Sequence, residues 1–361
     1  MARTLTTAAL LIMGTLAGPA PAAAYVAGET HRTTEQPSAA VRDARHRATL
    51  RITIWYPAPN GTAVQTLALG PPGRPPTFEA GAVAAEAPFA DEARRPVILL
   101  SHGYGGTARM MSWFAAPLAA AGYVVISVDH PGNNGVDPMT AAAEILSFER
   151  AEDLKRALAA VARDKLIGPH LDSARIGAAG FSAGGFTALL LGGARFDLAR
   201  LEAFCTAHPD DGVCRPQLEL AVTLADRERA LKDPEIAAAA KRAPDDHSIP
   251  AVKAAFAMAP ADVQGITPQS FEKMESLVWI VAGDADIVAP PATNAKVAAQ
   301  LIPGAKLDMV PQAGHYAFLS TCTAAGLKVV PACAQATAQQ EAHRLAIARA
   351  LELFGRQIGP Q

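Results

Sequence analysis

A serine stands at the junction between a predicted strand and a predicted helix, in the pentapeptide Gly180-Phe181-Ser182-Ala183-Gly184. Residues 173–179 before it have the pattern of a turn followed by a short buried strand, and residues 185–191 after it have that of an apolar helix. A serine flanked by glycines at this junction is typical of a nucleophile elbow. Side chains at the two glycine positions would clash with the neighbouring strand and helix. We therefore expect the Ser182 hydroxyl to be exposed above a sheet.

The rest of the chain alternates between apolar strands and helices. Continuous apolar strands of this kind predict an α/β fold, with a mostly parallel central sheet and helices on both faces. The first strand, residues 49–56, is expected to end before Pro57. Further strands are predicted at 97–101, 123–129, 254–258, 277–282 and 306–310, with helices at 108–121, 142–163 and 339–354.

Three segments interrupt this alternation. Residues 25–48 are predicted to be a flexible lead-in, and residues 57–95 a long surface connection. Residues 195–250 are charged, alanine-rich and helical in pattern, and they form a predicted insertion in a single domain that spans 25–361. Two interpretations of this insertion remain: a lid above the strand ends, or a surface decoration.

The first 24 residues have the features of a secretory signal peptide. A positively charged start precedes an apolar run, which is followed by small residues suited to cleavage near Ala24. An apolar run of roughly ten residues is too short to span a bilayer, which needs about 20. The sequence thus predicts a secreted or periplasmic protein without stable membrane insertion.

Charge and cysteine content agree with this prediction. The net charge is −2 and no block of Lys or Arg occurs, so nothing indicates a nucleic-acid partner. The four cysteines form an even set, as expected in an oxidising compartment. Short loops favour the pairs Cys205–Cys214 and Cys322–Cys333; the alternatives are free buried thiols or a metal site. A metal site is disfavoured because no C-x-x-C pair occurs.

A serine hydroxyl needs a base within hydrogen-bond reach to act as a nucleophile. His315 is the candidate, since it follows the last predicted strand in a loop that can project over the sheet. The acid that orients this histidine is predicted to be Asp286, after the strand at 277–282. Asp284 is interpreted as a turn-forming residue, and Asp262 is a weaker candidate.

Two backbone N–H groups are expected to bind the oxyanion that forms during acyl transfer. One is that of Ala183, and the other that of Tyr104 in the glycine-rich loop at 101–106. We interpret His102 as a structural residue of this loop. His130 is expected to border the mouth of the site, either supporting it or facing the substrate.

The chain resembles the α/β-hydrolase superfamily at residues 54–57, 102–106, 128–132 and 180–185. They are most similar to the exported bacterial group called predicted dienelactone hydrolases, which is similar to platelet-activating-factor acetylhydrolases. True dienelactone hydrolases carry a cysteine nucleophile, whereas this chain has Ser182. The acetylhydrolases take their acid from the preceding strand, where this chain has no aspartate until Asp262.

These observations predict a secreted serine esterase with the triad Ser182, His315 and Asp286, without a cofactor or metal. Its substrate would be a small-molecule or lipid ester, and the resemblance implies short acyl chains. A lipase or polyester hydrolase and a serine amidase or peptidase are alternatives that use the same residues. A non-catalytic binding protein on the same fold is the third. The sequence does not indicate an oligomeric state.

Overall fold

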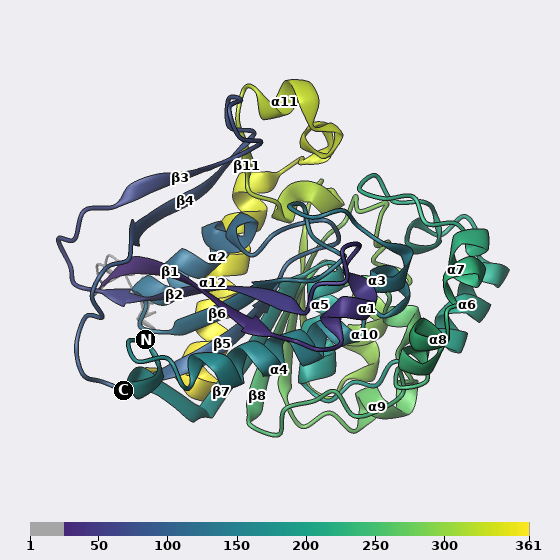
Figure 1. The fold of residues 1–361 in the computed structure, drawn as a ribbon, viewed down its shortest axis with the longest axis horizontal. Helices are drawn as coiled ribbons and strands as arrows, with labels where there is room; N and C mark the ends of the chain where they lie inside the picture. The colour runs from purple at the N-terminus through teal and green to yellow at the C-terminus, as the bar shows by residue number, and fades with distance from the viewer. Residues whose placement is uncertain (1–24, 361) are drawn as a thin grey trace, which may run out of the picture.

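A computed structural model describes residues 25–360, which form a large twisted sheet with helices on both faces (Figure 1). The signal peptide predicted at 1–24 lies outside the described residues. The strand order is β10-β9-β8-β7-β5-β6-β2-β1-β4-β11, and β3 pairs with β4. The strands are β1 Val26–Glu35, β2 Thr49–Ala58, β3 Gln65–Leu69, β4 Phe78–Ala85, β5 Arg95–Ser101, β6 Val124–Asp129, β7 Leu171–Phe181, β8 Val252–Met258, β9 Leu277–Gly283, β10 Lys306–Val310 and β11 Thr321–Cys322.

The six consecutive strands from β10 to β6 in this order are parallel. Strand β2 joins them antiparallel to β6, and β1 joins antiparallel to β2. Because the carboxyl ends of parallel strands meet at one edge of a sheet, the loops after β5, β7, β9 and β10 lie at the same edge. The predicted functional residues are on these loops.

Two apolar cores lie on opposite faces of the sheet. Helices α4, α5 and α10 cover one face, and α2 and α12 cover the other (Figure 1). The helices are α1 Ala39–Arg42, α2 Ser112–Ala120, α3 Ala141–Ile145, α4 Glu149–Val161, α5 Ala183–Leu191, α6 Leu198–Ala207, α7 Leu224–Ala230, α8 Pro234–Ala240, α9 Pro268–Glu272, α10 Ala295–Leu301, α11 Gly326–Val329 and α12 Gln339–Ile358. No helix within residues 25–360 is long and apolar enough to cross a membrane.

The predictions for the two N-terminal segments were wrong. Residues 25–48 contain β1 and α1, and residues 57–95 contain β3 and β4. Strand β1 is polar because one of its ends is largely exposed, yet all ten of its residues pair with β2, which continues past Pro57 to Ala58. Only two residues of β1 pair with β4 on its other side, so most of the strand does not require the continuous apolar run that identifies a buried strand.

The helix predicted at 142–163 is divided into α3 and α4 by a turn around Leu146. Thr140 caps the start of α3, where its hydroxyl accepts a hydrogen bond from the N–H of Ala143. The two parts have different neighbours: α3 contacts α1 and α7, whereas α4 packs on the sheet and α5. Because of this break, α3 contacts the insertion while α4 packs in the core.

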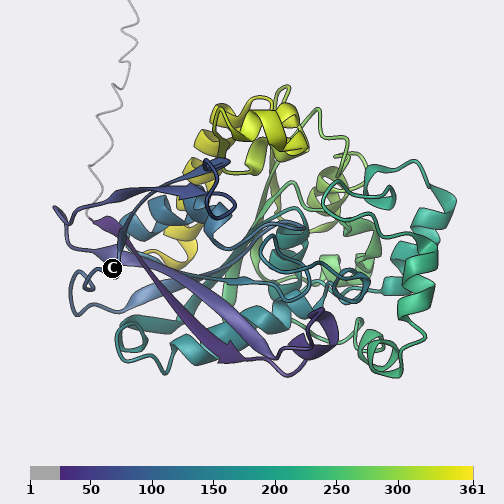
Figure 2. The same cartoon turned by 45° about the horizontal axis from the view of Figure 1, so that its top comes forward.

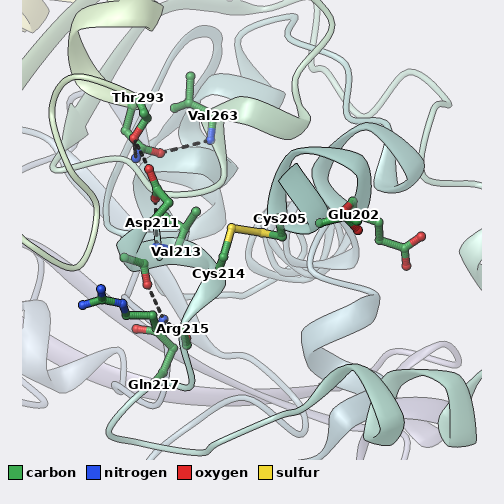
Figure 3. Close-up of a disulfide and its surroundings, with 12 residues drawn as sticks. Glu202, Cys205, Asp211, Val213, Cys214, Arg215, Gln217, Val263 and Thr293 are labelled. Atoms are coloured by element: carbon green, nitrogen blue, oxygen red, sulfur yellow. Dashed lines mark hydrogen bonds between the residues drawn. A yellow bond between two sulfur atoms is a disulfide. The ribbon is translucent and has the colours of Figure 1, made fainter. Parts of the chain in front are cut away.

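The insertion follows α5 and contains α6, α7 and α8, which lie together at one end of the molecule (Figures 1 and 2). The structure contains both expected disulfides, Cys205–Cys214 and Cys322–Cys333. The first joins α6 to the segment that includes Asp211 and Val213 (Figure 3). Asp211 in turn accepts a hydrogen bond of 2.8 Å from the hydroxyl of Thr293, which anchors this segment to the loop after β9.

Candidate active site

Ser182 lies in the sharp turn between β7 and α5. Its backbone is in an unfavourable region, with φ 57° and ψ −121°, as in strained strand-to-helix turns that present a nucleophile. The two flanking glycines are required because any larger residue would clash with neighbouring backbone. A Cβ atom at Gly180 would come within 2.1 Å of the Gly184 carbonyl oxygen, and one at Gly184 within 2.0 Å of the Ser101 carbonyl oxygen. The steric reason expected from the sequence therefore holds at both positions.

A chain of two hydrogen bonds joins Ser182, His315 and Asp286. The Ser182 hydroxyl lies 2.8 Å from Nε2 of His315, and Nδ1 of His315 lies 2.7 Å from Oδ2 of Asp286. All three side chains are buried. The second oxygen of Asp286 accepts the N–H groups of Val288 and Ala289, so the carboxylate is held from both sides.

The two other aspartates considered from the sequence lie elsewhere. Oδ1 of Asp284 accepts the N–H of Gln312 at 2.6 Å, so this side chain binds backbone as expected, although on the loop after β10 and not within its own turn. Asp262 lies across the site, in a cavity beside Ser182 and not beside His315.

Tyr104 and Ala183, the predicted oxyanion donors, both line a cavity beside Ser182. Ala183 is the first residue of α5, and within residues 25–360 neither N–H group donates a hydrogen bond. Free N–H groups at a helix start carry partial positive charge and favour an anion. Tyr104 and Ser182 line both cavities of the site.

The loop that carries Tyr104 is held by buried polar groups. Nδ1 of His102 donates to the Gly103 carbonyl at 2.7 Å, while Nε2 accepts the N–H of His130, so His102 has a structural place in the loop. The guanidinium of Arg150 donates to the His102 carbonyl and to Oδ1 of Asn133, which also accepts the N–H of Gly105. Burial lowers the pKa of Arg150. These contacts fix the backbone where the oxyanion donor is expected.

His130 does not border the mouth of the site as a substrate-facing residue. It is completely buried, with Nδ1 3.0 Å from Asp153 and Nε2 2.9 Å from the Ser101 hydroxyl. Arg42 forms two hydrogen bonds with Asp153 from the other side, at 2.7 and 2.9 Å. Burial lowers the pKa of His130 to about 3, so the ring is neutral. Its role is to connect the N-terminal segment and α4 to the loop after β5.

Ser182 lines two cavities. One holds about 30 Å³, is lined by His315 and Tyr316, and is named here the His315 cavity. The other holds about 80 Å³, is lined by Ala183 and Glu144, and is named here the Glu144 cavity. The insertion supplies part of both walls, and Ser182 is only 6 % exposed.

Several charged residues of the site were missed in the sequence. Glu144, Arg150 and Arg227 line the Glu144 cavity, and Glu219 of the insertion lines the His315 cavity. Only Arg150 could have been recognised from the sequence as a buried charged residue. It lies four residues before Leu154 and hence on the apolar face of the predicted helix. The others come together only through the path of the insertion.

Comparisons with known proteins agree with this fold. A sequence profile described as "Alpha/beta hydrolase family" matches residues 98–325, more than half of the chain. The chain therefore belongs to the alpha/beta hydrolase family and is a hydrolase, and the predicted fold class and superfamily are confirmed.

Among solved structures, the chain is similar to the ferulic acid esterase from Streptomyces cinnamoneus. The TM-score is 0.57, the sequence identity is 17 %, and the match covers 95 % of this chain and 92 % of that one. At this identity the likeness concerns the fold alone. A search of curated proteins found no match.

Proposed function

We propose that this hydrolase is a serine carboxylesterase in which Ser182 is the nucleophile, His315 the general base and Asp286 the residue that orients the histidine. The observation that carries the proposal is the chain of short hydrogen bonds from Ser182 through His315 to Asp286. The name of the structural neighbour, an esterase, supports ester hydrolysis as the reaction.

In this mechanism His315 accepts the Ser182 proton through Nε2 while the serine oxygen attacks the ester carbonyl. The N–H groups of Tyr104 and Ala183 stabilise the oxyanion, and one such donor contributes about 10²–10³ in rate. The imidazolium then protonates the leaving alcohol. Water, activated by the same histidine, hydrolyses the acyl-enzyme and returns Ser182 to its free form.

The proposed substrates are small-molecule or lipid esters with short acyl groups. A Glu144 cavity of about 80 Å³ supports this size, because it can hold a few heavy atoms but not a long chain. Short-chain preference also follows from the resemblance to exported predicted dienelactone hydrolases and platelet-activating-factor acetylhydrolases, which we retain as part of the proposal.

Export from the cytoplasm is the proposed location, in the form of a single domain with a helical insertion. Two disulfides support an oxidising compartment. The signal peptide at 1–24, with cleavage near Ala24, belongs to the same proposal and rests on the sequence alone.

The test is hydrolysis of p-nitrophenyl esters from acetyl to palmitoyl by the protein and its Ser182→Ala variant. We expect turnover that peaks at short acyl chains and falls by at least about 10⁴-fold in the variant, because no other group can form the acyl-enzyme. Comparable activity in a correctly folded Ser182→Ala variant would remove Ser182 from the mechanism.

A lipase or polyester hydrolase is the second candidate, favoured because the insertion supplies part of the walls of both cavities. In that case the insertion moves as a lid and the activity peaks at long chains. An amidase or peptidase would cleave the matching anilides instead. A binding protein would cleave neither and would not react with a serine-directed phosphonate.

A further inference from the structure

The two cavities beside Ser182 can be assigned to the two halves of an ester. During acyl transfer, the protonated histidine must reach the oxygen of the leaving alcohol. His315 lines the smaller cavity and is absent from the lining of the Glu144 cavity. The alcohol therefore leaves through the His315 cavity, and the acyl group occupies the Glu144 cavity.

The Glu144 cavity combines apolar side chains with several charged ones. One carboxylate oxygen of Glu144 accepts a hydrogen bond from the guanidinium of Arg227, which α7 of the insertion supplies. The other oxygen, Oε2, is buried and has no hydrogen-bond partner among the described residues. The same is true of the hydroxyl of Tyr104, a residue that lines both this cavity and the His315 cavity.

A second carboxyl group faces the same space. Asp262 has a left-handed backbone, with φ 54°, and its side chain forms no hydrogen bond or ion pair within residues 25–360. Burial raises the pKa of Asp262, and the positive charges of Arg227 and Arg150 oppose that rise. The cavity thus presents two carboxyl groups and the arginines Arg150, Arg215 and Arg227, with unpaired acceptor positions among them.

A purely aliphatic acyl group would complement only the apolar part of this cavity. It would leave Oε2 of Glu144 and the Tyr104 hydroxyl without a partner, and a buried polar group left unpaired costs roughly 1–3 kcal/mol. A carboxylate would lie against two carboxyl groups, and the three guanidinium groups already donate to other residues. An ammonium would lie against three guanidinium groups. A hydroxyl can both donate to Glu144 or Asp262 and accept from a neighbouring guanidinium or from Tyr104.

We propose that the Glu144 cavity is a subsite for a short acyl group that carries a hydroxyl, and that Glu144 and Asp262 select this hydroxyl. The proposal rests on the proposed esterase function. The volume of about 80 Å³ restricts the acyl group to a short chain. The substrate class is therefore esters of short hydroxy acids.

The experiment compares p-nitrophenyl 3-hydroxybutyrate with p-nitrophenyl butyrate, which have the same leaving group and the same chain length. We expect kcat/KM to be at least about tenfold higher for the hydroxylated ester, because a site built around a substrate hydroxyl discriminates strongly against the analogue that lacks it. Equal values, or a preference for butyrate, with turnover that depends on Ser182 would overturn the proposal and leave the esterase function intact.

The residues are tested with Glu144→Gln, which can still accept from Arg227 but replaces the unpaired acceptor with an NH₂ donor. Asp262→Asn is a second variant, because asparagine tolerates a left-handed backbone. In each, the ratio of the two kcat/KM values should fall to about threefold or less. Glu228→Gln, on the exposed side of α7, is the matched control and should keep the full ratio. An unchanged ratio in both cavity variants contradicts the assignment.

A binding measurement separates this proposal from the esterase function. In the Ser182→Ala variant, methyl 3-hydroxybutyrate should raise Tm more than an equal concentration of methyl butyrate does, and Glu144→Gln should abolish the difference. If no ester is turned over but this difference in Tm is found, the hydroxyl subsite is supported and the esterase function is wrong. If neither turnover nor a Tm difference is found, both proposals are wrong.

Discussion

At the scale of single residues, the two oxygens of Asp286 have separate tasks. Oδ1 is held by backbone N–H groups, and Oδ2 receives Nδ1–H of His315. In Asp286→Asn, an NH₂ group at the second position would favour the wrong tautomer of the imidazole. We expect kcat to fall by about 10³–10⁴-fold, with little change in KM, because the defect concerns proton transfer and not substrate binding.

Asp284→Asn is the matched control for this substitution. Among the described residues its carboxylate accepts a hydrogen bond from the N–H of Gln312 alone, and an asparagine oxygen can also accept it, so kcat should change by less than about threefold. Steady-state kinetics of both variants on p-nitrophenyl acetate decide the assignment. A loss in Asp284→Asn as large as that in Asp286→Asn would show that the wrong aspartate was chosen.

The residues that could be chosen from the sequence share a local context. Ser182 lies at a strand-to-helix junction, and Asp286 and His315 each follow a continuous apolar strand, so their chain order and positions in a parallel sheet could be predicted. Glu144 and Arg227 have no such context. They are 83 residues apart and meet only because α7 packs beside α3. Non-local packing of this kind leaves no pattern in the sequence.

At the scale of secondary-structure elements, the disulfide Cys205–Cys214 ties α6 to the segment that forms one wall of the Glu144 cavity. Replacing both cysteines with alanine should lower the free energy of unfolding by about 2–3 kcal/mol, because a loop of about ten residues is no longer closed in the unfolded chain. The loosened wall should also admit longer acyl chains. Urea unfolding and the p-nitrophenyl ester series measure the two effects.

The double variant Cys322→Ala/Cys333→Ala provides the comparison. Its loop is of similar length, so the loss of stability should be similar, but neither cysteine lines either cavity. Its acyl-length profile should match that of the unmodified protein. If both double variants broaden the profile equally, the effect belongs to general destabilisation and not to the wall of the cavity.

Elements of the central sheet were predictable because strands covered on both faces need continuous apolar runs. The elements β1, β3 and β4 escaped prediction since they lie toward one side of the sheet, where polar residues are tolerated. Pro57 was a misleading signal. It lies near the end of β2, opposite Ala27 of β1, so the strand continues past it.

At the scale of the whole molecule, the fold keeps several histidines neutral. Burial lowers the pKa of His130 to about 3 and that of His343 to about 4, and it also lowers the pKa of His102. The unfolded chain binds protons at these sites near pH 6.5, whereas the folded chain does not. The stability from each histidine is therefore complete above pH 6.5 and is lost as the pH falls towards its folded pKa. Glu144 has the opposite effect on how stability depends on pH, because burial raises its pKa to about 7.

His343 on α12 allows this linkage to be measured far from the site. Its ring stacks on Trp113 with centroids 3.6 Å apart, and Nε2 donates to the Leu319 carbonyl at 2.8 Å. His343→Gln can keep the hydrogen bond but has no group that titrates. Between pH 6 and pH 4.5, the free energy of unfolding of the original protein should fall more steeply than that of the variant, by about 1.4 kcal/mol per pH unit. Urea unfolding at pH 7.5, 6.0, 5.2 and 4.5 gives both slopes. Parallel curves would mean that His343 is protonated in the folded state, and hence that α12 opens to water more readily than its packing indicates.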